Sequence, residues 1–318
     1  MSIANLKITA LAGGIGAAKL LLGMASVTPP ENIAVIANTG DDVKLHGLHI
    51  SPDIDTVTYT LAGEIDPEKG WGLKEDSFNC LDWLARYAGP QWFNLGDRDL
   101  ATHLYRTDGL ASGLTLSEIT DRIRRSLSVA VQILPMTDSF VPTWVDTDQG
   151  QMHLQEYFVR RRCEPKVNDI VYRDIESCSP AAGVLDAISA ADVVVICPSN
   201  PFISIGPILA VPGIREALQR TTAIVIAVSP IVGGRALKGP ADNMLRDLGH
   251  EVSALGVARM YRDIVSLFIL DRVDSSLGPE IVKLGIKVTM ADTIMTTLAD
   301  KRRLAGEVLG AASAKASV

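Results

Sequence analysis

A glycine turn near the N-terminus contains the first residues whose types and spacing suit a chemical role. Gly13, Gly14 and Gly16 directly follow the apolar run 6–12, and Lys19 comes shortly afterwards. Glycines let a backbone approach a phosphate without a Cβ in the way, and the free N–H groups at a helix start attract anions. The same residues also suit a tight turn that binds nothing. The position of the turn directly after the first predicted strand favours the phosphate site.

The turn does not match the two commonest nucleotide-binding motifs. A P-loop needs Ser or Thr directly after its lysine, whereas Leu20 follows Lys19. A dinucleotide-binding fold expects an acidic residue about 20 positions on, at the end of the second strand, and Asn38 stands there instead. An NAD-dependent oxidoreductase is therefore a disfavoured alternative. We count Asn38 with the glycines and Lys19 as a candidate nucleotide contact.

Two later loops also follow apolar strands. Ser199 and Asn200 lie in the PSNP segment 198–201, and Ser229 opens the SPIVGG segment 229–234. Open α/β sheets bind ligands along the edge at which their parallel strands end. Two rigid turns without a ligand would give the same pattern. Three such loops at one edge together favour a binding site, and we predict that Ser199, Asn200 and Ser229 contact a nucleotide.

Carboxylates gather in the segment 41–55 and again in 97–99. Magnesium prefers one or two carboxylates plus substrate oxygens, and phosphoryl transfer needs a cation to balance the developing charge. Asp42 and Asp55 are the candidate metal ligands. Each of these aspartates could instead cap a helix, because Ser51 followed by Pro52 is typical of a helix start.

These residues need a scaffold of alternating strands and helices. The predicted strands are 6–12, 33–37, 129–134, 143–146, 153–159, 169–172, 192–197, 222–228, 266–270 and 286–288. The predicted helices are 17–24, one from 51, 77–88, one from 95, one from 115, 179–190, 213–219 and 292–309, with a frayed tail over 311–318. The pattern predicts one α/β domain over 1–318, Rossmann-like and doubly wound, with a mostly parallel sheet. Strands 129–175 lack intervening helices, so we expect a partly antiparallel insertion of roughly 60–175 beside the active-site cleft.

Composition limits the class of protein. The chain has 318 residues, is 47% hydrophobic and only 5% aromatic, and carries a formal net charge of −7. Abundant aliphatic residues favour parallel strands buried on both faces. An acidic chain without a basic face argues against nucleic-acid binding. No signal peptide or membrane-spanning run is visible, and the four cysteines form no CxxC pair, so we expect a cytoplasmic protein.

Several strings resemble one known family in its own order. These are GGIGAAKLL, NTGDD, ISPDIDT, WGLKEDSF, LGDRDLATH, ILPMTD, PSNPFISIGPIL, VSPIVGG and a late ADT. They resemble the CofD family, the 2-phospho-L-lactate transferases that help make the deazaflavin coenzyme F-420. The resemblance runs from about Lys7 to about Leu309, nearly the whole chain.

The resemblance implies a specific reaction. Such enzymes move the phosphorylated hydroxy acid of a guanosine diphosphate ester onto the ribityl hydroxyl of a deazariboflavin, and they release GMP. They require Mg²⁺, and they have a Rossmann-like fold that is commonly dimeric. In such enzymes an aspartate and a basic residue hold the deazaflavin. The best matches here are Asp55, in SPDIDT, and Arg98, in LGDRD, which we take as the candidate catalytic residues.

Two points stay open at this stage. Similar sequences often have GGTGTPK in the glycine turn, whereas this chain has Ile15 and Ala17 there, and related enzymes use enolpyruvyl or glyceryl donors instead of lactyl ones. The acid is therefore not assigned. A related gluconeogenesis-factor family, which shares the glycine turn and the sheet but acts as a nucleotide-binding regulator, is the alternative to a transferase.

Overall fold

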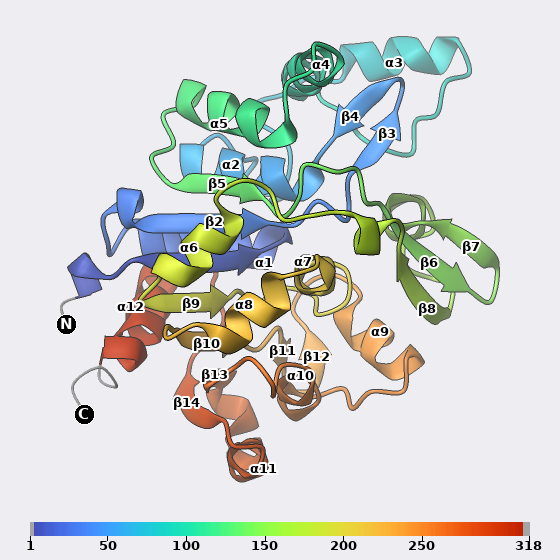
Figure 1. Ribbon diagram of the computed structural model, residues 1–318. Helices are drawn as coiled ribbons and strands as arrows, with labels where there is room; N and C mark the ends of the chain where they lie inside the picture. Colours follow the sequence, from blue (N-terminus) through green and yellow to red (C-terminus); the bar gives the residue numbers. More distant parts are fainter. Residues whose placement is uncertain (1–2, 314–318) are drawn as a thin grey trace.

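Seven parallel strands form the central sheet, in the order β14-β13-β10-β9-β1-β2-β5 (Figure 1). The computed structural model describes residues 3–313. Every neighbouring pair in this sheet runs parallel, which confirms the predicted fold class. In chain order the strands are β1 (Ile8–Ala12), β2 (Ile33–Ala37), β5 (Gln132–Pro135), β9 (Val193–Ile196), β10 (Ile224–Val228), β13 (Leu267–Asp271) and β14 (Lys287–Ala291).

Aliphatic side chains on both faces of the sheet form the core. In β9, Val194 and Ile196 pack on one face while Val193 and Val195 pack on the other. Successive side chains of a strand point to opposite faces, so a strand covered on both sides must be apolar throughout. This accounts for the unbroken apolar runs in the sequence.

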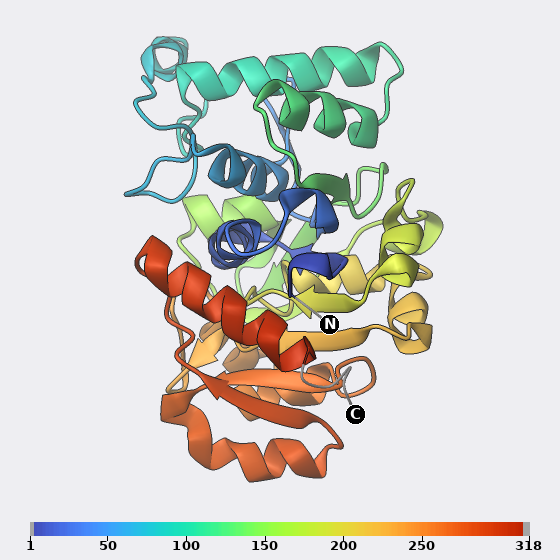
Figure 2. The same ribbon diagram turned by 90° about the vertical axis from the view of Figure 1, so that its left-hand side faces the viewer.

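Helices cover both faces. The helices on one face are α1 (Gly14–Ala25), α2 (Pro52–Ala62), α5 (Leu116–Ser126) and α12 (Leu298–Ser313). The helices on the other face are α6 (Val184–Ala190), α7 (Ile205–Ala210), α8 (Ile214–Arg220), α9 (Ala241–Asp247), α10 (Ala254–Met260) and α11 (Gly278–Lys283). Figure 2 shows α12, in red, crossing one face of the sheet. None of the helices within residues 3–313 has both the length and the apolar character needed to cross a membrane.

The winding of the chain reverses beside β1. From β1 the chain continues to β2 and β5 on one side, whereas β9, β10, β13 and β14 follow on the other side. Where the winding reverses, the loops leaving neighbouring strands diverge and open a crevice at their carboxyl ends. The loops after β1 and β9 therefore flank the expected ligand position.

Smaller elements extend from the sheet in the part of the chain that runs from β2 to β9. They are the hairpin β3 (Val43–Leu45) and β4 (Leu48–Ile50), the helices α3 (Asn79–Arg86) and α4 (Asp97–Ala111), and an antiparallel sheet of β6 (Thr143–Thr147), β7 (Gly150–His153) and β8 (Val167–Tyr172). The antiparallel excursion exists as predicted. The predicted strand 129–134 is not part of it, because β5 pairs parallel with β2 in the central sheet.

Three local predictions need correction. The strand predicted over 153–159 ends at His153, and a helical turn covers Glu156–Arg160. The buried residues Leu154 and Tyr157 of this segment are three positions apart, which is a helical spacing. The last helix begins at Leu298 rather than at 292, since the Asp300 carboxylate accepts from the backbone N–H of Thr297. It continues to Ser313, and the rest of the predicted tail, 314–318, lies outside the described residues.

Two tight hairpins were not predicted from the sequence. His46 and Gly47 turn β3 into β4, and Gly233 and Gly234 turn β11 (Ile231–Val232) into β12 (Arg235–Ala236). All four turn residues have positive φ, which two-residue hairpins require. The Gly-Gly pair was the available signal. The loop after β12 matters for function because it returns to the edge of the sheet that carries the site.

Candidate active site

A cavity of about 670 Å³ lies at the carboxyl ends of the parallel strands. The loops after β1, β2, β9, β10 and β14 line it, together with α2, the start of α4 and the loop after β12. The cavity lies at the edge of the sheet at which the sequence predicts a binding site. Of the predicted site residues, those that line the cavity are Gly13, Gly14, Gly16, Lys19, Asp55, Ser199, Asn200 and Ser229.

The glycine turn packs tightly against the protein itself. Gly13 precedes α1 in an extended conformation, and Gly14 has φ of +71°. A Cβ on Gly13 would lie 2.5 Å from the Oδ2 of Asp53, and one on Gly16 would lie 2.3 Å from the carbonyl oxygen of Pro198. The glycines thus let the loop after β9 and the Asp53 side chain close over the turn, and they also leave the helix start open to the cavity.

Lys19 lines the cavity wall one turn into α1. Its Nζ donates to the carbonyl oxygen of Met295 at 3.2 Å. Burial lowers the pKa of Lys19, and the nearby charges of Lys238 and Lys301 lower it further. This ammonium group is therefore partly engaged within the protein.

Asn38 lies behind the cavity wall rather than in it. The side chain is fully buried, its Nδ2 donates to Asp53 Oδ2 at 2.8 Å and to the Ile203 carbonyl at 3.1 Å, and its Oδ1 accepts from Gly40 N–H. With these groups satisfied, Asn38 positions Asp53 instead of contacting a nucleotide.

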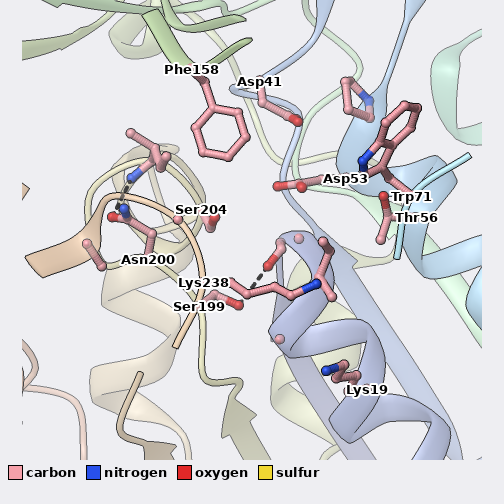
Figure 3. A pocket seen from close by; sticks show the side chains of 18 of the residues that line it. Lys19, Asp41, Asp53, Thr56, Trp71, Phe158, Ser199, Asn200, Ser204 and Lys238 are labelled. Carbon is pink, nitrogen blue, oxygen red and sulfur yellow. Dashed lines mark hydrogen bonds between the residues drawn. The ribbon is translucent and has the colours of Figure 1, made fainter. Parts of the chain in front are cut away.

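Asp41 and Asp53 form a crowded pair of carboxylates on the cavity. Both are buried, and Figure 3 shows their oxygens directed toward the same space. Burial raises the pKa of Asp53 to about 7. Burial also raises the pKa of Asp41 well above its usual value, and the charge of Asp53 raises it further. The Oδ1 of Asp41 has no hydrogen-bond partner among the described residues. Burial thus disfavours the ionised form of both carboxyls.

Asp42 points away from this pair, contrary to its predicted role as a metal ligand. Its Oδ2 accepts from Ser51 Oγ at 2.8 Å and lies 2.8 Å from His49 Nε2. The side chain does not line the cavity. Asp42 instead ties the β3–β4 hairpin to the start of α2.

Asp55 is held in a buried ion pair. Its carboxylate accepts from both terminal nitrogens of Arg106, with Nη1 at 3.0 Å from Oδ2, and the Arg106 side chain is completely buried. His103 Nδ1 lies 3.7 Å from the same oxygen. Because both oxygens of Asp55 already bind the guanidinium, less of the carboxylate is left for a metal ion or a substrate. Asp55 therefore suits a positioning role better than the catalytic and metal-binding roles predicted for it.

Arg98 is exposed and does not line the cavity. Its Nη1 donates to the Lys74 carbonyl at 3.4 Å. The next residue, Asp99, is buried, lines the cavity and accepts from Tyr59 Oη at 2.8 Å. In the LGDRD string the residue that faces the cavity is thus Asp99, and the prediction for Arg98 is one position away from it.

Asp99, His103 and Arg106 form a group of functional candidates that was not predicted from the sequence. Their spacing of four and then three residues places them on one face of α4. Three polar residues on the buried face of a helix were the available signal. They meet Tyr59 and Asp55, which lie on one face of α2 for the same reason.

The polar side chains of the loops after β9 and β10 make hydrogen bonds within the protein. Ser199 Oγ donates to the Gly13 carbonyl at 2.8 Å, and Asn200 Oδ1 accepts from the N–H groups of Phe202 and Ile203. Ser229 Oγ donates to the Ile231 carbonyl. These hydrogen bonds stabilise the loops, although each of the three residues also borders the cavity.

Taken together, a doubly wound parallel sheet with a glycine turn and paired carboxylates at its carboxyl edge is typical of enzymes that act on phosphorylated ligands. Among such enzymes, the model of the family described as 2-phospho-L-lactate transferase CofD matches residues 8–281. The chain belongs to this family, and the predicted resemblance is confirmed.

Curated relatives agree over nearly the whole length. The chain is 43% identical over 310 residues to the "Phosphoenolpyruvate transferase" of Streptomyces griseus, covering 96% of this chain and 98% of the relative. It is 39% identical over 300 residues to the "2-phospho-L-lactate transferase" of Methanosarcina acetivorans, covering 94% and 97%. Relatives with both names are transferases, which confirms the predicted class of enzyme.

A solved structure shares the fold. The crystal structure of protein BH3568 from Bacillus halodurans aligns with a TM-score of 0.63 at 18% identity, covering 97% of this chain and 99% of that one. A second structure of that protein is described as a member of the UPF0052 family and aligns with a TM-score of 0.64. At this identity the likeness concerns the fold alone.

Proposed function

We propose that this enzyme transfers a phosphorylated hydroxy-acid group from a guanosine diphosphate ester to the ribityl hydroxyl of a deazariboflavin, as in coenzyme F-420 synthesis. The observation that carries the proposal is the buried pair of Asp41 and Asp53, which faces an open cavity beside the glycine turn of α1. Phosphoryl transfer depends on positioning and charge balance, and this pair is where a balancing cation belongs.

A divalent cation such as Mg²⁺ fits the residues present. Asp41 has a buried Oδ1 without a hydrogen-bond partner among the described residues, and burial raises the pKa of both carboxyls, so a bound cation would stabilise their ionised forms. Mg²⁺ prefers carboxylate and phosphate oxygens. Asp41 and Asp53 would hold it, in place of the Asp42 and Asp55 predicted from the sequence. When bound, Mg²⁺ supplies charge neutralisation for the reacting phosphoryl group.

The donor diphosphate belongs at the start of α1. The first N–H groups of a helix have no intrahelical acceptor, and this helix start borders the cavity. One of these groups, the Gly14 N–H, already donates to Asp53. The remaining amides of the first turn are the candidates for phosphate binding.

The acceptor belongs on the opposite wall. Tyr59, Asp99 and His103 form a connected polar group there, and Trp71 and Phe93 line the same cavity with aromatic faces. A flat polar ring system such as a deazaflavin would find stacking surfaces and hydrogen-bond partners on this wall. Asp99 replaces Arg98 as our candidate contact to the acceptor.

The reaction is a displacement at phosphorus. The acceptor hydroxyl oxygen forms a new bond to the phosphorus that carries the acid, and the bond from that phosphorus to the GMP oxygen breaks. GMP leaves with the bonding electron pair, and the hydroxyl proton passes to a carboxylate of the pair. Both carboxylates border the cavity, so either one can accept this proton from the acceptor hydroxyl.

We propose that the donor carries an enolpyruvyl group, since several relatives named "Phosphoenolpyruvate transferase" are 41–43% identical to this chain. We also propose that the enzyme is a cytoplasmic homodimer.

The test is an assay of purified enzyme with deazariboflavin, Mg²⁺ and three guanylylated donors carrying lactyl, enolpyruvyl or glyceryl groups. Product mass identifies the acid, and GMP release reports turnover. The proposal predicts a phosphodiester product with at least one donor, highest with the enolpyruvyl donor. Absence of any product under conditions in which the enzyme binds GDP would contradict the transfer.

A further inference from the structure

The cavity contains few positive charges for the ligand that it is proposed to bind. Among the residues that line it, Lys19 and Lys238 are the only lysines, and no arginine is present. The proposed donor carries two phosphates and a carboxylate. Asp41 and Asp53 add negative charge to the same space, so each free cation in the wall has a large electrostatic effect.

Lys19 is the less available of the two lysines. Its Nζ already donates to the Met295 carbonyl at 3.2 Å, and burial lowers its pKa. A partly buried ammonium with a backbone acceptor gains less from an added anion than a free one does.

Lys238 has no hydrogen-bond or ion-pair partner among the side chains that the structure describes. It lies in the loop between β12 and α9, and Figure 3 shows it extending along the start of α1 beside Ser199. Its charge is the second cause of the lowered pKa of Lys19, so the two ammonium groups act on the same region.

The neighbouring polar groups do not substitute for Lys238. Ser199 Oγ, Asn200 Oδ1 and Ser229 Oγ hydrogen-bond within the protein. The loop that carries Lys238 follows the β11–β12 hairpin, which is held in place because the Gly233 N–H donates to the Asp274 carboxylate at 3.0 Å. The free lysine therefore reaches the helix start from a supported loop.

We propose that Lys238 binds an oxyanion of the donor, a phosphate or the carboxylate of the transferred acid, and fixes that end of the donor against the start of α1. This assignment rests on the proposed function. Lys238 acts as a donor-binding residue and adds a positive charge to the amides at the start of α1.

The test compares Lys238→Ala, Lys238→Arg and the control Lys287→Ala, a change of an exposed lysine on β14 away from the cavity. Calorimetry with GDP and Mg²⁺ and steady-state kinetics with the full donor are run on each purified enzyme. We expect Lys238→Ala to raise the donor KM about tenfold or more, because a charge-assisted hydrogen bond is lost. Lys238→Arg keeps most of the affinity, and Lys287→Ala matches the wild type.

Comparing GDP with the full donor shows whether Lys238 binds a phosphate or the carboxylate of the acid. Equal weakening of GDP and donor places Lys238 on a phosphate, and weakening of the donor alone places it on the carboxylate. Wild-type affinity of Lys238→Ala for both ligands would overturn the assignment. Wild-type enzyme that neither binds GDP nor releases GMP would instead contradict the proposed function, which keeps the two failures distinct.

Discussion

At the scale of residues, four aspartates close together in sequence have different surroundings. Asp41 and Asp53 face the cavity, whereas Asp42 is bound by Ser51 and His49 and Asp55 by Arg106. The sequence predicted that this acidic segment forms part of the site. It could not predict which carboxylates face the ligand, because their partners come from α4 and from a hairpin whose packing no local pattern reveals.

Asp53→Asn tests the raised pKa of Asp53. Burial raises this pKa from 3.8 to about 7, so the unfolded chain loses the Asp53 proton at a lower pH than the folded protein does. In metal-free protein, the stability of the wild type should therefore fall relative to Asp53→Asn between pH 4 and 7, by at most about 4 kcal/mol. Urea unfolding at several pH values measures the difference. Parallel pH curves for the two proteins would argue against the shift.

The same variant separates catalysis from folding. Asp53→Asn should lose at least about 100-fold in kcat because one of the two carboxylates proposed to hold the cation and accept the proton is gone, while its circular dichroism stays unchanged.

Asp99→Asn and Arg98→Ala test which residue of the LGDRD string contacts the acceptor. Asp99 is buried on the cavity and hydrogen-bonded to Tyr59, whereas Arg98 is exposed. We expect Asp99→Asn to raise the acceptor KM about tenfold and Arg98→Ala to change it less than threefold. A larger effect from Arg98 would restore the assignment made from the family resemblance. Acceptor titration at saturating donor provides the measurement.

At the scale of elements, α2 and α4 are joined by a buried ion pair. Arg106→Ala should lower the free energy of unfolding by about 3–5 kcal/mol, since it leaves the Asp55 carboxylate buried without its partner. The exposed Arg98→Ala on the same helix serves as the control and should stay within about 0.5 kcal/mol of the wild type. Equal effects of the two changes in denaturant unfolding would mean that the pair contributes nothing to joining the helices.

The turn between β1 and α1 depends on close packing. A Cβ on Gly16 would lie 2.3 Å from a backbone oxygen of the loop after β9, which cannot move as a flexible side chain would. Gly16→Ala should therefore destabilise the protein and weaken GDP binding. The matched control is Gly306→Ala in α12, where nothing lies within 4 Å, and this change should be neutral or stabilising by up to about 1 kcal/mol. Thermal melts and GDP titrations of both variants measure these effects. A neutral Gly16→Ala would contradict the need for close packing at this turn.

Elements with strong local signals were predicted best. The apolar runs that became β1, β9 and β10 were recognised because strands buried on both faces must be apolar throughout. The segment 153–159 was misjudged because its apolar residues fit both a strand and a helix over so short a length. The short helices α7, α9, α10 and α11 carry too few turns to show a periodic pattern.

At the scale of the whole molecule, the order of the strands decides where chemistry takes place. The reversal beside β1 places the loops after β1 and β9 on either side of a crevice at one edge, and the carboxylates after β2 complete that edge. The sequence predicted the edge because parallel strands share their carboxyl ends. It could not predict that α4 and the loop after β12 close the sides, because neither follows directly from a strand that ends at the site.

The central claim is that a cation at Asp41 and Asp53 holds a guanosine diphosphate at the start of α1. Crystals grown with GDP and Mn²⁺, measured for the anomalous signal of manganese, test it most directly. We expect one strong peak within coordination distance of carboxylate oxygens from both Asp41 and Asp53, with the diphosphate beside Gly14. A peak at Asp42 or Asp55, or a nucleotide bound away from this edge of the sheet, would contradict it.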